Sequence, residues 1–169
     1  MMIVETNNLL LREMTEGDFC PLYKIFSDAE TMAYYPAPFD EDQVKAWISW
    51  NLDNYATYNY GLWTLVKKNT GEVIGDCGLI NQTVEGIEEI EVGYHVNKKF
   101  WGKGYATEAA IACRDYAFSN LGFSKVISLI RPENVASRKV AEKNGMKIEK
   151  EIMKSGFNHY VYACSQELA

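Results

Sequence analysis

The sequence has no long hydrophobic run. Although 47% of its 169 residues are hydrophobic, no uninterrupted apolar stretch approaches the roughly 18 residues that a membrane-spanning helix requires. The first residues, in which Glu5 is followed by Thr6, Asn7 and Asn8, also lack the apolar core of a secretory signal peptide. These two absences lead us to expect a soluble, cytoplasmic protein with no membrane partner.

Cysteine and histidine are scarce. The only histidines are His95 and His159, so we expect no metal site. The four cysteines are far apart and form no Cys-x-x-Cys pair, a usage that favours reduced thiols over a disulfide framework. They are Cys20, Cys77, Cys113 and Cys164.

An excess of basic residues is also missing. The chain has 17 lysines and arginines against 23 aspartates and glutamates, for a net charge of −6. General nucleic-acid binding depends on an excess of positive charge, so we expect no nucleic-acid partner and a site that accommodates a cationic substrate more easily. No repeat, low-complexity tract or Pro/Gly/Ser-rich linker divides the chain, and residues 1–169 are predicted to form one domain.

The spacing of apolar residues predicts a mixed α/β (α+β) fold. Helices are expected from Thr15 to Asp28, from Asp40 onward and from Asn134 to Gly145, with a further long helix before the strand at 125–130. That long helix separates the strands at 89–96 and 125–130, which predicts a parallel pair. The strands are expected at residues 3–14, 62–67, 73–80, 89–96, 125–130, 146–153 and 158–165.

The most informative segment is Trp101-Gly102-Lys103-Gly104-Tyr105-Ala106-Thr107-Glu108-Ala109. It follows a strand with period-two alternation, and helical spacing of apolar residues begins within the segment itself. The first turn of a helix has free backbone N–H groups and a partial positive charge of roughly +0.5, which together favour an anion. The sequence therefore predicts a phosphate-binding junction here.

Other interpretations of the two glycines differ in what they require nearby. A Walker A loop needs a Gly-Lys-Ser/Thr ending in a frame that Gly102, Lys103 and Gly104 do not provide. A Rossmann fingerprint needs a third glycine or alanine where Thr107 stands and an acidic residue about 20 positions later. A simple tight turn stays open, but it leaves the immediate start of the helix unexplained.

The segment resembles the acyl-CoA pyrophosphate loop of the GNAT superfamily of N-acetyltransferases, written Arg/Gln-x-x-Gly-x-Gly/Ala. The match is Trp101-x-x-Gly104-x-Ala106, in which Trp101 replaces the usual Arg or Gln. That departure is similar to the RimJ/RimL-like branch of ribosomal-protein N-terminal acetyltransferases. Three further motifs resemble the same branch in the same order: Leu9-Leu10-Leu11-Arg12, Glu91-Val92-Gly93-Tyr94 and Asn134-Val135-Ala136-Ser137.

This resemblance implies a GNAT-type fold and activity. The expected fold is a mixed, mostly antiparallel sheet of about seven strands, with a splayed parallel pair and about four helices on both faces. The implied reaction is direct transfer of an acetyl group from acetyl-CoA, with no metal, by a single acyltransferase domain. The alternative, from another class, is a non-catalytic acyl-CoA sensor or interaction module that keeps the loop without turnover.

The resemblance also implies which residues bind the acyl donor. The pyrophosphate would lie on backbone amides of the glycine segment, and the pantetheine arm would run along the strand near Tyr94 and Val96. Lys98, Lys99 and Lys103 would add local positive charge. The implied cofactor-binding residues are Tyr94, Val96, Gly102, Lys103, Gly104, Tyr105, Ala106, Thr107 and Asn134.

The same resemblance implies two catalytic residues. Glu91 is the first candidate for the base, with Glu89, His95 and water as open alternatives. Many superfamily members protonate the leaving thiolate with a tyrosine seven residues after the motif asparagine, but this position is Ala141 here. Ser137 becomes the candidate proton donor, although it could equally serve only in capping the helix that starts after Asn134.

The acceptor is expected to be a primary amine. The resemblance places the acceptor pocket at the loop and helix around residues 34–47, and the candidate substrate-binding residues are Tyr34, Tyr35, Phe39 and Glu89. A protein N-terminal α-amine is favoured, and another small cationic amine, such as a polyamine, an amino acid or an aminoglycoside, stays open. A monomer and a homodimer are equally compatible with the sequence.

Overall fold

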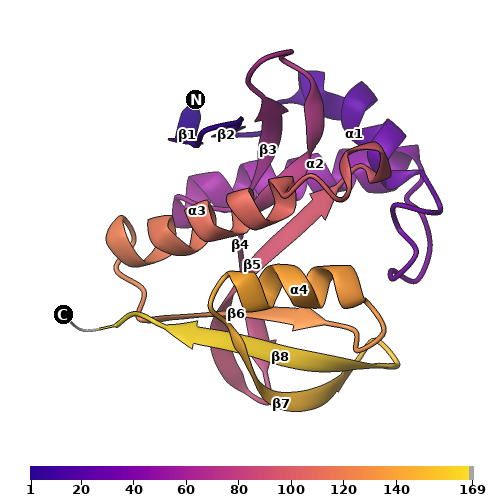
Figure 1. Ribbon diagram of the computed structural model, residues 1–169. Helices are drawn as coiled ribbons and strands as arrows, with labels where there is room; N and C mark the ends of the chain where they lie inside the picture. The colour runs from indigo at the N-terminus through magenta and orange to yellow at the C-terminus, as the bar shows by residue number, and fades with distance from the viewer. Residues whose placement is uncertain (168–169) are drawn as a thin grey trace.

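The computed structural model describes residues 1–167 and contains one eight-stranded sheet with four α-helices (Figure 1). The strand order across the sheet is β1-β2-β3-β4-β5-β6-β8-β7, and every neighbouring pair is antiparallel except β5 and β6. This arrangement confirms the predicted mixed, mostly antiparallel sheet with one parallel pair. The strands are β1 (Met2–Glu5), β2 (Leu9–Arg12), β3 (Leu62–Lys67), β4 (Val73–Val84), β5 (Ile87–Val96), β6 (Lys125–Ile130), β7 (Lys147–Lys154) and β8 (Phe157–Ser165).

The four helices begin close to the residues that the sequence indicated. Asp40 caps α2 (Glu41–Tyr58) by accepting a hydrogen bond from the Gln43 amide at 2.8 Å, and Asn134 caps α4 (Val135–Lys143). The third helix, α3 (Tyr105–Ser119), starts directly after Gly104, which agrees with the prediction of a helix that begins within the glycine segment. The first helix is shorter than predicted, because a 3₁₀ turn at Glu16–Asp18 precedes α1 (Phe19–Phe26). Within residues 1–167, no helix combines the length and apolar character needed to cross a membrane.

The prediction of one opening strand over 3–14 was wrong. Thr6 and Asn8 form a turn in which the Thr6 amide donates to the Leu9 carbonyl at 2.9 Å, and the chain reverses there. The segment therefore gives two antiparallel strands, β1 and β2, and the sheet gains an eighth strand. Polar turn-forming residues between two apolar runs are the local cause of this reversal.

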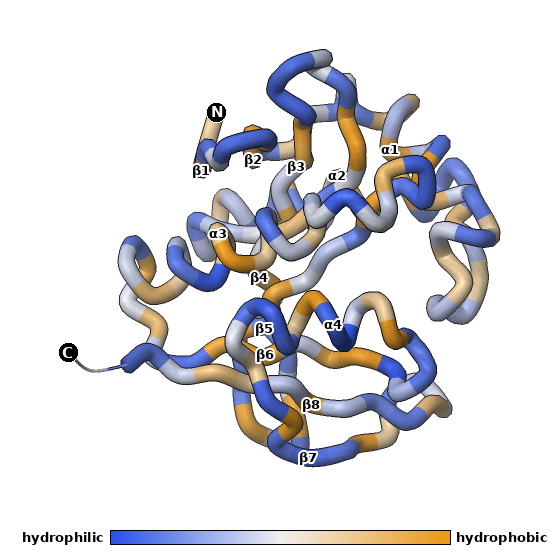
Figure 2. The backbone as a smooth tube through the Cα atoms, viewed as in Figure 1, coloured by the Kyte–Doolittle hydropathy of each residue, from blue (hydrophilic) through white to orange (hydrophobic). Residues whose placement is uncertain are grey.

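Helices cover both faces of the sheet. On one face, α3 packs on β4 and β5 around the buried side chains of Trp63, Cys113 and Ala117. On the other face, α1 and α2 pack around Leu22 and Phe26. Figure 2 shows the hydrophobic residues concentrated in the central strands and the hydrophilic residues in the connecting turns.

The sheet divides between β5 and β6. These parallel strands share a single paired position, Glu91 with Ile127, whereas β4 and β5 are paired from Gly75–Val96 to Val84–Ile87. Figure 1 shows β6, β7, β8 and α4 diverging from the rest of the sheet beyond this point. The division places the ends of two neighbouring strands around an open space.

Candidate active site at the division of the sheet

Side chains replace the backbone ladder where β5 and β6 separate. The Leu129 amide donates to Glu91 Oε2 at 2.9 Å, and the Ser128 hydroxyl donates to the Val92 carbonyl at 2.7 Å. The other Glu91 oxygen accepts a hydrogen bond from the Gln82 side chain at 2.9 Å. Because these side-chain bonds satisfy backbone groups that would otherwise continue the ladder, they hold the two strands apart.

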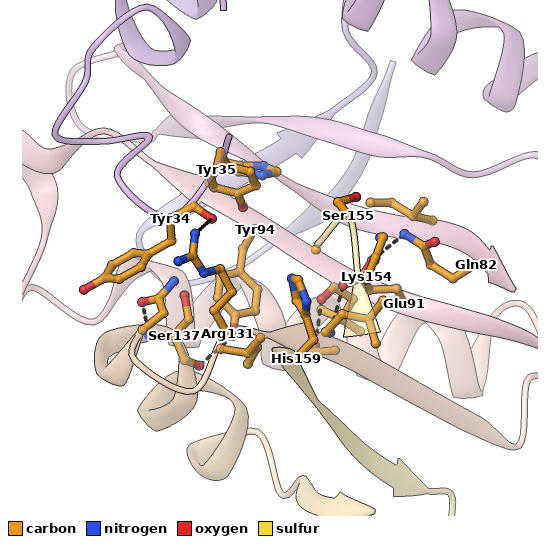
Figure 3. A pocket seen from close by; sticks show the side chains of 18 of the residues that line it. Tyr34, Tyr35, Gln82, Glu91, Tyr94, Arg131, Ser137, Lys154, Ser155 and His159 are labelled. Atoms are coloured by element: carbon orange, nitrogen blue, oxygen red, sulfur yellow. Dashed lines mark hydrogen bonds between the residues drawn. The ribbon is translucent and has the colours of Figure 1, made fainter. Parts of the chain in front are cut away.

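A cavity of about 380 Å³ lies at this division (Figure 3). Side chains in a strand alternate between the two faces of the sheet, so Glu91 and His95 point to the face that α1 and α2 cover, and Tyr94 points to the other face. All three residues line the cavity, together with Trp47 and Ser137. The cavity is therefore accessible to groups from both faces of the sheet.

On the α4 side, the Tyr94 hydroxyl donates to the Ser137 carbonyl at 2.8 Å. The Ser137 amide in turn donates to the Asn134 side chain at 3.2 Å, so the first turn of α4 is fixed to β5. Burial raises the pKa of Tyr94, and this phenol stays protonated at neutral pH. Ala141, which occupies the usual tyrosine position, is buried in α4 and offers no hydroxyl.

The glycine segment leads directly into α3 at the same end of β5. Gly102 and Gly104 have φ values of 75° and 82°, a left-handed conformation that favours glycine, and no atom lies within 4 Å of the Cβ position at either residue. No side chain caps the N-terminus of α3, which starts at Tyr105. Open glycines and a helix start without a capping side chain leave the first backbone amides of α3 free of side-chain partners.

Glu108 is the one acidic residue in the first turn of α3. Its carboxylate accepts hydrogen bonds from the Thr6 hydroxyl at 2.5 Å and from the Asn8 amide and side chain at 3.0 and 2.8 Å. Burial raises the pKa of Glu108, but these hydrogen bonds outweigh that effect and hold the pKa below its usual value. The turn between β1 and β2 therefore fixes this negative charge.

Trp101 ties the glycine segment to the end of β5. Its indole N–H donates to the Val96 carbonyl at 2.7 Å, while 49% of the residue stays exposed. In the sequence, Trp101 was notable only because it replaces the usual Arg or Gln of the GNAT motif. The hydrogen bond gives the tryptophan a structural role that its identity did not reveal.

We expect Trp101→Phe to weaken CoA binding about three- to tenfold, because a neutral hydrogen bond contributes about 0.5–1.5 kcal/mol net and the segment would lose its anchor to β5. Isothermal titration calorimetry with CoA measures the effect, and Tyr58→Phe, at an exposed aromatic residue of α2 outside the cavity lining, serves as the control. A Trp101→Phe protein that binds CoA as tightly as the wild type would show that the anchor is dispensable.

A second cluster lies on the α2 side of the cavity. The Nδ1 atom of His95 is 2.7 Å from Asp76 Oδ1, and the Trp47 indole N–H donates to Asp76 Oδ2 at 3.0 Å. The Asp76 side chain is fully buried and that of His95 is 9% exposed. Sequence reasoning named His95 but missed Asp76, which stands in an otherwise apolar strand segment beside Cys77.

The predicted acceptor residues separate into two groups. Tyr34 and Tyr35 line the cavity, as Figure 3 shows. Phe39 and Glu89 are not among the lining residues: Phe39 packs against Phe26 and Trp47, and Glu89 forms an ion pair with Lys125 at 3.3 Å. The local sequence, a proline-containing loop around Phe39 and an acidic turn before Glu89, did not predict these tertiary partners.

The three lysines near the glycine segment also differ. Lys98 forms ion pairs with Asp28 and Glu30 at 3.3 and 2.8 Å, and Lys99 lies 3.6 Å from Glu72. Their charges are largely compensated by these partners, which reduces the local positive potential expected from the sequence. Lys103 lies within the segment itself and is exposed.

Comparisons with known proteins agree with this geometry. Residues 8–147 match the acetyltransferase (GNAT) domain family. The chain is 41% identical over 150 residues to the uncharacterized protein YkkB of Bacillus subtilis (88% of this chain, 87% of the relative), and 30% identical over 173 residues to the uncharacterized N-acetyltransferase YnaD of the same organism (98% of each). A solved structure of RimL, described as a ribosomal L7/L12 α-N-protein acetyltransferase in complex with coenzyme A, shares the fold with a TM-score of 0.79, 16% identity and 98% coverage of both chains. The chain belongs to the GNAT family and is an N-acetyltransferase, an enzyme class whose acyl donor is acetyl-CoA.

Proposed function

We propose that this enzyme transfers the acetyl group directly to a primary amine, most favourably a protein N-terminal α-amine, in the cavity at the division of the sheet. The observation that carries this proposal is that one cavity takes side chains from both faces of the sheet. An acyl donor on the α3 and α4 side and an amine on the α1 and α2 side can meet there without a covalent enzyme intermediate.

The glycine segment is suited to the diphosphate of acetyl-CoA, which supplies the activated acetyl group. We assign this binding to the backbone amides from Gly102 through Thr107, because the glycines leave room for close approach and the helix start has no capping side chain. Lys103 adds the exposed positive charge of the segment.

The pantetheine arm is assigned to the open side of β5. The Val92 carbonyl accepts from Ser128 and the Val96 carbonyl from Trp101, so the peptide groups at 92, 94 and 96 face the gap next to β6. Tyr94 and Asn134 would border the arm on this side. A hydrogen bond between the arm and the backbone of Val96 would use the Val96 N–H, because the Val96 carbonyl already accepts from Trp101.

Glu91 and Ser137 remain the proposed catalytic residues. Each Glu91 oxygen accepts one hydrogen bond and, as a carboxylate, has capacity for another, so the side chain can interact with an incoming ammonium. The Ser137 hydroxyl is the proposed proton donor to the leaving thiolate, because the first turn of α4 is fixed beside Tyr94 and lines the cavity. CoA thiolate is a fair leaving group, so a weak donor suffices.

The charges around the cavity favour an acceptor with a single amine over a polycation. Within the described residues, the lining includes one carboxylate, Glu91, two histidines, and two basic side chains, Lys154 and Arg131, of which Arg131 pairs with Glu133 at 2.6 Å. A polyamine or an aminoglycoside would bring further positive charges close to these cations. At pH 7, moreover, deprotonating an α-amine costs about 1 kcal/mol and a lysine amine about 4 to 5 kcal/mol, by reference pKa values. The shared fold with RimL is compatible with a RimJ/RimL-like role.

The experiment is a thiol-release assay with acetyl-CoA against a panel of acceptors. The panel contains peptides with free Ser or Ala N-termini, the same peptides with blocked N-termini and an internal lysine, spermidine, free amino acids and an aminoglycoside. We expect the highest kcat/KM for free N-termini and none for the blocked peptides. Turnover with spermidine or the aminoglycoside alone would overturn the assignment of the acceptor.

A further inference from the structure

The cluster of Asp76, His95 and Trp47 has no part in the reaction as described above. We propose that His95 is the general base that accepts the proton of the acceptor amine, and that Asp76 is its positioning residue. The inference rests on the proposed function, since it assigns a role within amine acetylation. It also assigns to Glu91 a distinct role, that of a fixed negative charge that attracts the ammonium.

The hydrogen bonds determine the tautomer of His95. Both oxygens of the buried Asp76 carboxylate accept hydrogen bonds, Oδ2 from the Trp47 indole at 3.0 Å and Oδ1 from His95 Nδ1 at 2.7 Å. An ionised carboxylate can only accept, so Nδ1 carries the proton and Nε2 keeps a lone pair. Among residues 1–167, no group forms a hydrogen bond with His95 Nε2. This nitrogen is not among the fully buried polar atoms that lack a partner, so it is accessible to solvent. In this tautomer Nε2 is the acceptor nitrogen, and His95 lines the cavity.

Three aromatic rings hold the imidazole in place. The ring centroids of Phe26, Tyr35 and Trp47 lie 5.5, 5.1 and 5.7 Å from that of His95. These contacts, with the bond to Asp76, fix the ring orientation and restrict water around it, as a general base requires.

Ionisable groups around His95 come from several elements of the fold, and the basic side chains of Arg131 and Lys154 line the same cavity. Asp76 on β4 and Glu91 on β5 are carboxylates, and Tyr35 comes from the loop before α2. Although 38% of Tyr35 is exposed, burial of its hydroxyl raises the pKa, and the charges of Glu91 and Asp76 raise it further, so the phenol stays neutral. The two carboxylates can stabilise the imidazolium that forms when His95 takes up a proton.

The proton balance assigns different tasks to the two candidate bases. The ammonium loses one proton to His95 Nε2, which later passes it to solvent. As the C–N bond forms and the C–S bond of the thioester breaks, the nitrogen loses a second proton to water, the sulfur gains a proton from Ser137, and Ser137 regains one from water. The products are the amide, the CoA thiol and the one proton that His95 releases. Imidazole is matched to proton uptake near neutral pH, whereas a carboxylate is a weak base there. Glu91 has one hydrogen bond on each oxygen and is better placed to act through its charge.

The test compares pH profiles of kcat/KM for the wild type, His95→Gln and Asp76→Asn, with acetyl-CoA and a peptide acceptor that the wild type acetylates. We expect His95→Gln to lower kcat about 100-fold, within the usual contribution of a general base, and to abolish the acid limb of the profile. Asp76→Asn should lower kcat less and shift the acid limb to lower pH. CoA affinity, measured by calorimetry, should change less than threefold in both proteins.

Two further measurements separate this proposal from its alternatives. With trifluoroethylamine, an acceptor that is mostly neutral at pH 7, the loss in His95→Gln should shrink at least fivefold, which a merely structural defect would not produce. His159→Gln, at the other histidine of the cavity lining, should keep the acid limb, and loss of the limb in this variant instead of in His95→Gln would overturn the proposal. An active wild type whose acid limb survives in His95→Gln and disappears in Glu91→Gln would overturn the proposal and leave the acetyltransferase function intact. A wild type that acetylates none of the amines would instead contradict the proposed function.

Discussion

Replacing Ala106 with aspartate is expected to weaken CoA binding at least 100-fold. Ala106 lies in the first turn of α3, where the free amides and a partial charge of about +0.5 are proposed to hold the diphosphate. A carboxylate there would occupy these amides itself. It would also repel a diphosphate charge by about 3 kcal/mol at roughly 5 Å and an effective dielectric constant of 20. Calorimetry with CoA at constant ionic strength measures the loss of affinity.

The matched control adds the same charge at the other end of the same helix. Ser119→Asp places a carboxylate at the exposed last residue of α3, about 20 Å from Ala106 for a helix of this length. Because this separation exceeds the Debye length of about 8 Å at physiological salt, CoA affinity should be unchanged. Equal affinity in Ala106→Asp and Ser119→Asp would contradict the position assigned to the diphosphate.

Replacing Glu91 with glutamine is expected to lower kcat by roughly 10- to 100-fold, which corresponds to about 1.4 to 2.7 kcal/mol in the barrier. The change removes the only carboxylate in the described lining of the cavity but keeps an oxygen that can accept from the Leu129 amide. The hydrogen bond with Gln82 is retained if the Gln82 amide rotates by 180°, so that its oxygen accepts from the new NH2 group at position 91. The division of the sheet and the CoA affinity should therefore persist, so steady-state kinetics isolates the effect of charge.

Two further variants separate the effect of the Glu91 charge on kcat from effects of surface charge and of stability. Glu88→Gln removes the same charge from an exposed position of β5 and should leave kcat unchanged. Glu91→Leu also removes the acceptor of the part-buried Leu129 amide. Because a fully buried unsatisfied amide costs about 1 to 3 kcal/mol, the free energy of unfolding should fall by up to that amount. Unchanged turnover in Glu91→Gln would exclude Glu91 from catalysis.

The parts of the site that depend on local sequence could be predicted. Gly104 before α3 and Asn134 before α4 act within a few residues of themselves, so the helix starts followed from spacing and capping rules. The parallel pairing of β5 and β6 followed from the long helix between them. For the two helix starts, the pattern and the interaction lie in the same short segment.

The parts that depend on tertiary partners could not be predicted. His95 meets Asp76 because the turn between β4 and β5 brings these two positions opposite each other in the sheet. The partner of Trp101 is a backbone carbonyl, which no side-chain pattern reveals. Glu89 shares a face with Glu91 and forms an ion pair with Lys125 of β6, a tertiary partner that the sequence did not indicate.

The most direct measurement is a crystal structure of the enzyme with CoA bound. It should show the diphosphate on the main-chain amides between Gly102 and Thr107, and the thiol end in the cavity between Tyr94 and Ser137. A diphosphate bound at any other surface, or a thiol end outside the division between β5 and β6, would contradict the account of this site.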